Sequence, residues 1–295
     1  MTESVPPWFS DAITAACTEH TVTVDGAAIH YLDWGDQSNP GIVFVHGGGA
    51  HAHWWSFLAP LLKNRYRVVA LDLSGHGDSD RRERYPRRQW AREVMAVIEH
   101  ADFTEPPVLV GHSMGGLVSI VAAALHSDAL AGVIIVDSPV SKPDPESQAR
   151  QSGFSFGELK VYPDRETALS RFRLIPSQPC ANAYLVDHVA RHSLKQVPGG
   201  YTWKFDPKIF DLVQHEPMAE HLSSIRCRIA LMRGEHSVVV PAETGEYMYQ
   251  LLHRNAPLVE IPGAHHHLIL DQPLAFIAAL RALLADWTHS VRPTE

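Results

Sequence analysis

Short apolar runs alternate with longer amphipathic stretches along most of the chain. The apolar runs lie at 42–45, 66–71, 107–111, 132–137, 227–232 and 257–261. Such runs are typical of strands that are buried on both faces of a sheet. Stretches of helical length follow them, at 54–63, 87–100, 115–124, 242–252 and 274–287. This alternation predicts a mainly parallel sheet with helices on both faces.

Two regions depart from the alternation. Residues 21–31 contain two β-rich runs around Asp25-Gly26, a dipeptide typical of hairpin turns. Between 139 and 222 the chain is irregular and rich in Pro, Arg and aromatic residues. We therefore predict an α/β core formed by residues 1–138 and 223–295, with residues 139–222 inserted into it as a cap.

Charge and cysteine content limit the environment and the partners of the protein. The 25 basic and 33 acidic residues give a net charge of −8, which argues against a nucleic-acid or anionic-membrane surface. Three scattered cysteines are too few for a disulfide framework and fit a reducing cytoplasm. We find neither the pattern of a signal peptide nor an apolar run of membrane-spanning length. We expect a cytoplasmic monomer or homodimer without nucleic-acid or membrane partners.

The segment Gly111-His112-Ser113-Met114-Gly115 has the G-x-S-x-G pattern of a nucleophile elbow. It lies between a predicted strand and a predicted helix, which is the context that this motif requires. The glycines leave room for the strand and the helix to approach each other, and the turn projects the Ser113 hydroxyl. The Met114 N–H then lies at a helix N-terminus, where it can receive an oxyanion.

A serine hydroxyl needs an imidazole base, an acid that holds the base, and backbone donors for the oxyanion. The glycines of His46-Gly47-Gly48-Gly49, directly after a predicted strand, are suited to present N–H groups to a substrate. The base lies in a segment with three consecutive histidines, His265, His266 and His267. Their chemistry alone does not distinguish them.

In the order and spacing of these motifs the chain resembles the serine α/β-hydrolases, esterases and lipases among them, from about residue 20 to 287 outside the insertion. A fourth matching motif is Asp72-Leu-Ser-Gly-His-Gly-Asp-Ser79. The resemblance implies a mainly parallel eight-stranded sheet with a cap insertion. It also implies that His266 is the base, because the register is set by Asp271-Gln-Pro273. His265 then stands where the family usually has glycine.

The acid departs from the family's pattern. The family most often places an aspartate three residues after the glycine that ends a late strand, and here that position is Ser237. Some members take the acid from the end of the strand that follows the elbow helix, and Asp137 matches that position. Glu235 lies on the usual loop in a shifted register. We favour Asp137 slightly and keep Glu235 as the alternative.

The resemblance implies a hydrolase that cleaves a small or medium carboxylic ester through an acyl-enzyme on Ser113. Gly48 and Met114 would stabilise the oxyanion, and no cofactor is expected. Residues expected to line the site are Gly47, His112, Trp54 and His267. Alternatives on the same residues are a lactone, amide or carbon–carbon bond hydrolase, a cyanohydrin lyase, and a non-catalytic receptor. The histidines at 51, 53 and 265–267 lack accompanying Cys or carboxylate spacing, so no metal site is predicted.

Overall fold

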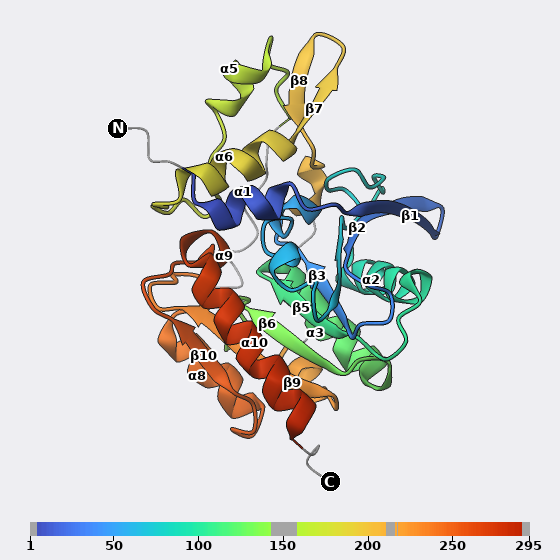
Figure 1. The fold of residues 1–295 in the computed structure, drawn as a ribbon, viewed down its shortest axis with the longest axis vertical. Helices are drawn as coiled ribbons and strands as arrows, with labels where there is room; N and C mark the ends of the chain where they lie inside the picture. Colours follow the sequence, from blue (N-terminus) through green and yellow to red (C-terminus); the bar gives the residue numbers. More distant parts are fainter. Residues whose placement is uncertain (1–4, 143–157, 211–215, 217, 291–295) are drawn as a thin grey trace.

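The computed structural model describes residues 5–142, 158–210, 216 and 218–290, and it is built around an eight-stranded sheet (Figure 1). The strand order is β1-β2-β4-β3-β5-β6-β9-β10. In this sheet β2 is antiparallel to both β1 and β4, and the other neighbouring strands are parallel. The strands are β1 (Thr18–Val24), β2 (Ala27–Trp34), β3 (Gly41–Val45), β4 (Arg67–Leu71), β5 (Val108–His112), β6 (Gly132–Val136), β9 (Arg228–Gly234) and β10 (Leu258–Ile261). The predicted hairpin and the mainly parallel eight-stranded sheet are confirmed.

Helices cover both faces of the sheet, as predicted. They are α1 (Pro7–Ile13), α2 (Arg87–Ala101), α3 (Met114–His126), η3 (Ser127–Ala129), α8 (Ala242–Leu251), α9 (Leu268–Asp271) and α10 (Pro273–His289). Successive residues of the central strands point to opposite faces. In β3, Ile42 and Phe44 join the cluster that contains α10, whereas Val43 joins the cluster that contains α2, α3 and α8. The helix α10 crosses the front of the sheet in Figure 1.

The helix predicted over 54–63 is wrong. This segment instead forms two short 3₁₀ turns, η1 (Ala52–Trp54) and η2 (Ala59–Leu61). Pro60 has no N–H to donate, and its ring would clash with the carbonyl four residues earlier in an α-helix. Trp55, Phe57 and Leu58 are nevertheless fully buried. The apolar pattern therefore correctly indicated that this segment is buried, but it wrongly indicated that the segment is an α-helix.

The segment between β6 and β9 contains more regular structure than its sequence suggested. It forms α5 (Arg165–Leu169), α6 (Ala183–His192), the hairpin β7 (Leu194–Val197) and β8 (Gly200–Trp203), η5 (Pro207–Phe210) and α7 (Met218–Ser223). In Figure 1, α5, α6 and the hairpin stand above one end of the sheet. In contrast, α7 packs on α3 and α8.

Hydrogen bonds join this upper part to the sheet. His76 forms an isolated β-bridge with Phe205. The Asp206 N–H donates to the Gly75 carbonyl at 2.7 Å, and its carboxylate accepts from the Tyr85 hydroxyl at 2.8 Å. The upper part is therefore bonded to the loop that follows β4, next to the ends of the central strands.

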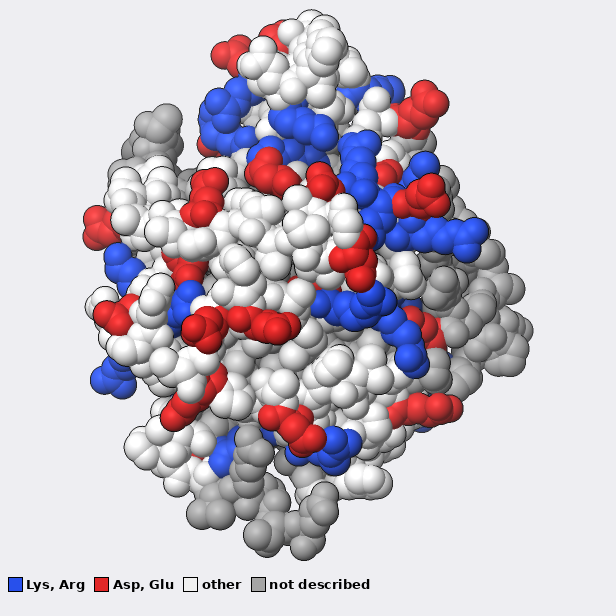
Figure 2. Space-filling model, turned by 90° about the vertical axis from the view of Figure 1, so that its right-hand side faces the viewer, with Lys and Arg blue, Asp and Glu red and all other residues white. Residues whose placement is uncertain are grey.

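Charged side chains are interspersed on the face shown in Figure 2. Basic groups gather in its upper part, the region that holds α5 and the β7–β8 hairpin in Figure 1. Among the described residues, no helix is both long and apolar enough to cross a membrane.

Candidate active site

Ser113 lies in the turn between β5 and α3, in a backbone conformation that only a tightly packed turn maintains. Its φ of 55° and ψ of −122° lie outside the regions that ordinary residues favour. A Cβ added to Gly115 would lie 2.4 Å from the carbonyl oxygens of Val45 and His46. A Cβ on Gly111 would lie 2.4 Å from the Gly115 carbonyl oxygen. Both glycines are therefore required for the close approach of strand and helix that positions Ser113.

The structure brings Ser113, His266 and Asp137 into one chain of hydrogen bonds. His266 Nδ1 lies 2.6 Å from Asp137 Oδ2, and His266 Nε2 lies 3.0 Å from Ser113 Oγ. A carboxylate can only accept, so Nδ1 carries the proton and Nε2 accepts from the serine hydroxyl. Asp137 directly follows β6, and His266 lies between β10 and α9. The parallel sheet brings these three positions to the same edge.

Asp137 is fully buried, and its carboxylate is surrounded by donors. Oδ1 accepts from the Gly234 N–H at 3.0 Å, and Oδ2 accepts from the Ser237 hydroxyl at 2.6 Å as well as from His266. These three hydrogen bonds fix the position of the carboxylate. Ser237 occupies the position where the family most often has the acidic residue. Its hydroxyl donates a hydrogen bond directly to Asp137. No sequence signal beyond its position pointed to this contact.

Glu235, the alternative acid, has a different partner. Its Oε2 accepts from the Gly263 N–H at 2.7 Å, and its side chain is 45% exposed. Asp137, rather than Glu235, thus lies within hydrogen-bonding distance of His266.

The glycine loop lies beside Ser113. A Cβ added to Gly47 would lie 3.2 Å from Ser113 Cβ, and Gly47 and Gly48 line the same cavity as Ser113. His46 holds the loop, because its Nδ1 donates to the Gly47 carbonyl at 2.7 Å and its Nε2 accepts from the Leu73 N–H at 3.1 Å. The Met114 N–H is the first of α3 and so has no acceptor within the helix.

The histidines beside His266 have other contacts. His112 Nε2 donates to the His266 carbonyl at 2.9 Å, and burial lowers the pKa of His112 well below its ordinary value. His112 is therefore a neutral side chain that anchors the segment of His266. Burial and the neighbouring His266 lower the pKa of His267 to about 3. The backbone N–H of His265 donates to Asp271 at 2.8 Å.

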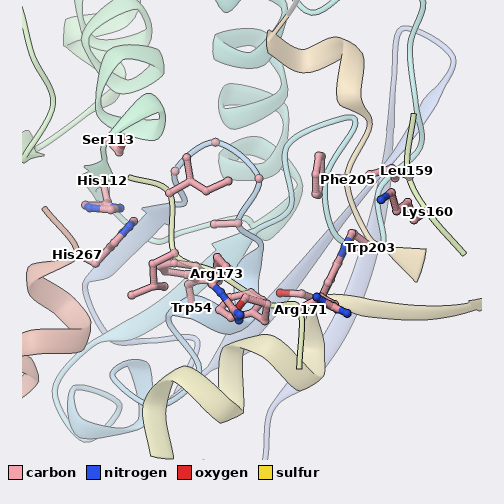
Figure 3. Close-up of a pocket in the computed structure, with 18 of the residues that line it drawn as sticks. Trp54, His112, Ser113, Leu159, Lys160, Arg171, Arg173, Trp203, Phe205 and His267 are labelled. Atoms are coloured by element: carbon pink, nitrogen blue, oxygen red, sulfur yellow. The ribbon is translucent and has the colours of Figure 1, made fainter. Parts of the chain in front are cut away.

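Ser113 lines a cavity of about 280 Å³ (Figure 3). Its floor, as we call it, comprises Gly47, Gly48, Gly49, His112 and Ser113. Its roof comprises residues of the segment between β6 and β9, namely Glu158, Leu159, Lys160, Tyr162, Arg171, Phe172, Arg173, Leu174, Ile175, Ser193, Trp203 and Phe205.

Side walls complete the cavity. Trp54 and His267 line it between floor and roof, with ring centroids 5.4 Å apart. Figure 3 shows Arg171 and Arg173 close to Trp54 and remote from Ser113. Both arginines are exposed, so they lie at the mouth of the cavity. The expected lining residues Gly47, His112, Trp54 and His267 are thus all found there.

Two groups of histidines near the cavity are close enough to share a metal ion. One comprises His112, His266 and His267, and the other His53, His188 and His192. Both nitrogens of His266 already bind Ser113 and Asp137, so an ion in the first group would compete with the hydrogen-bonded chain.

Comparison with known proteins agrees with this architecture. Residues 42–280 match the model of the alpha/beta hydrolase family. The chain is 29% identical to esterase Rv0045c of Mycobacterium tuberculosis over 271 residues, which are 88% of each chain. It is 28% identical to a pimeloyl-[acyl-carrier protein] methyl ester esterase of Chromobacterium violaceum, over 82% of this chain and 92% of that one.

Among solved structures, the thioesterase domain from the curacin biosynthetic pathway is similar at a TM-score of 0.74 and 26% identity. The similarity covers 92% of this chain and 99% of that domain. The esterase relatives and the fold support hydrolase activity on esters. With its eight-stranded sheet and a family match over most of its length, the chain belongs to the alpha/beta hydrolase family.

Proposed function

We propose that the protein is a serine esterase that cleaves a small or medium carboxylic ester. The observation that carries this proposal is the hydrogen-bonded chain from Ser113 Oγ through His266 to Asp137, which meets the cavity at Ser113. The cavity volume of about 280 Å³ suits a small or medium substrate. The esterase relatives support the choice of bond.

In the proposed reaction, Ser113 Oγ attacks the ester carbonyl carbon while His266 Nε2 accepts its proton. The carbonyl π electrons move to the oxygen, where the N–H groups of Gly48 and Met114 stabilise the negative charge. His266 then gives the proton to the leaving alkoxide as the ester C–O bond breaks. Water repeats the sequence on the acyl-enzyme and releases the acid. Asp137 holds the imidazole tautomer and stabilises the imidazolium.

We also propose residues 139–222 as the cap and residues 1–138 and 223–295 as the core. The described part of the cap contributes the roof, so it selects substrates rather than performing the chemistry. Cys17 and Cys180 are free thiols, which supports a cytoplasmic location.

Release of p-nitrophenol from short-chain p-nitrophenyl esters tests the proposal, with Ser113→Ala as the control. We expect turnover that is abolished in the variant. A fluorophosphonate probe should transfer its phosphonyl group to Ser113 with loss of fluoride, and this labelling should fail in His266→Ala. Activity that survives in Ser113→Ala would remove this serine from its role.

Absence of both turnover and labelling would favour a non-catalytic receptor of the same fold. Labelling without ester turnover would instead point to a lactone, amide or carbon–carbon bond substrate, or to lyase chemistry on the same serine.

A further inference from the structure

Three histidines meet where the roof joins the core, outside the hydrogen-bonded chain of Ser113. His53 belongs to η1, in the segment that follows the glycine loop. His188 and His192 belong to α6. Their chain neighbours Trp54 and Ser193 both line the cavity. The cluster therefore connects two walls of the cavity that are far apart in sequence.

The three rings are close enough to share one ion. One ring nitrogen from each lies within 4.8 Å of the others. The rings of His53 and His192 are stacked with centroids 4.0 Å apart, and those of His188 and His192 are 4.5 Å apart. His188 and His192 are four residues apart on one helix, a spacing that places both imidazoles on the same face.

The hydrogen bonds of these rings leave nitrogens available for a ligand. His192 Nδ1 donates to the His188 carbonyl at 2.9 Å, so its Nε2 carries a lone pair. The Ser56 hydroxyl donates to the His53 carbonyl and lies 2.8 Å from His188 Nε2, which orients that ring. His53 Nδ1 is buried without a hydrogen-bond partner among the described residues. An imidazole held through one nitrogen and open at the other is the usual arrangement of a metal ligand.

The cluster is also uncharged at neutral pH. Burial and mutual repulsion lower the pKa of His53 to about 3, and burial together with the proximity of His192 lowers that of His188 to about 4. Metal ions bind the neutral form of imidazole. A bound ion would thus meet three ready ligands and would have no proton to displace.

We propose that His53, His188 and His192 form a site for a divalent transition metal ion such as Zn²⁺. Three imidazoles with a water molecule would complete a four-coordinate site. Zn–N bonds of about 2.0–2.1 Å require the nitrogens to approach to about 3.4 Å, so binding turns the stacked rings of His53 and His192 toward a common point. The bound ion fixes α6 to η1, and thereby fixes Trp54 and Ser193 on the cavity wall.

The experiment uses the full chain without an affinity tag, freed of metal and titrated with Zn²⁺ against a chromophoric chelator. We expect one high-affinity ion per chain. Affinity should fall at least about tenfold in both His188→Asn and His192→Asn. It should be unchanged in His126→Asn, a matched change of an exposed histidine, and in His266→Asn, which removes the histidine bound to Ser113.

Thermal unfolding supplies a readout that separates binding from misfolding. Zn²⁺ should raise the Tm of the parent chain and of His126→Asn, but not that of His192→Asn. Circular dichroism of the metal-free variants checks their fold, and His192→Gln replaces any variant that fails this check. The proposal is overturned by the absence of a high-affinity ion, by affinity that persists in both α6 variants, or by loss of binding in His266→Asn.

Discussion

The floor and the roof of the cavity differ in the kinds of contact that their residues make. In the floor and beneath it, polar side chains have defined partners, and glycines fill spaces that admit no Cβ. The carboxylate of Asp137 accepts three hydrogen bonds, and a Cβ added to Gly115 would collide with two carbonyl oxygens. The roof presents aromatic and aliphatic side chains such as Phe172 and Trp203, with exposed arginines at the mouth.

This difference predicts that the floor controls the rate of the reaction and that the roof controls the choice of substrate. A change in the floor alters hydrogen bonds that act on the reacting atoms, so it should alter kcat. A change in the roof alters apolar surface that contacts the remainder of the substrate, so it should alter the preference among substrates. The predictions below test this separation.

The largest effect is expected for Asp137→Asn. The amide cannot hold His266 in the tautomer whose Nε2 accepts from Ser113, so kcat should fall by about 10⁴-fold. Steady-state kinetics on p-nitrophenyl acetate measures this loss. The matched change Glu235→Gln retains an acceptor for the Gly263 N–H and should alter kcat by no more than about twofold. The reverse ranking would make Glu235 the acid.

Ser237→Ala should reduce kcat by about tenfold, because it removes a hydroxyl that donates to a buried carboxylate. Ser237→Thr retains the donor and should restore most of the activity. Thermal unfolding checks that Ser237→Ala is folded. Full activity in Ser237→Ala, or no recovery in Ser237→Thr, would contradict the role of this hydroxyl in positioning Asp137.

The pH dependence of stability tests the role of His76, which lies at the junction between the roof and the core. Burial lowers its pKa from 6.5 to about 3. Below pH 6.5 the unfolded chain takes up a proton that the folded chain does not bind, so stability is lost as the pH falls towards 3. His76→Gln should reduce this dependence by up to about 1.4 kcal/mol per pH unit.

Urea unfolding between pH 4 and 7, with a metal chelator present, measures the slope for His76. His126→Gln, at an exposed histidine, should leave the slope unchanged. An equal slope in the parent chain and in His76→Gln would show that this ring titrates normally in the folded protein.

The smallest effect on catalysis is expected from the roof. Trp203 packs against Tyr162 and Phe172, and Trp203→Ala removes apolar surface from the cavity. We expect kcat/KM for an octanoyl ester to fall by about three- to tenfold, with acetyl ester turnover almost unchanged. A series of p-nitrophenyl esters of increasing chain length measures this. An equal loss on every ester would contradict the separation of floor and roof.

The sequence predicted the floor well because its motifs are local. Gly111 and Gly115 each lie two residues from Ser113, which they help to position, and the sheet could be predicted from continuous apolar runs. Ser237 escaped prediction because its contact with Asp137 spans one hundred residues. The roof escaped prediction because its short elements depend on packing against the core, and its hairpin turns at Pro198-Gly199 inside an otherwise irregular composition. In the sequence, Pro60 was the residue that argued against a helix over 54–63.

The position of Asp137 directly after β6 has a consequence for the order in which the site is assembled. The glycine loop, the nucleophile and the acid all precede the inserted segment in the chain, whereas His266 follows it and two further strands. During synthesis from the N-terminus, the emerging protein thus carries a serine without its base until the roof segment has been made. On the proposed mechanism, the linear order of its residues therefore protects a nascent chain from premature reaction with esters.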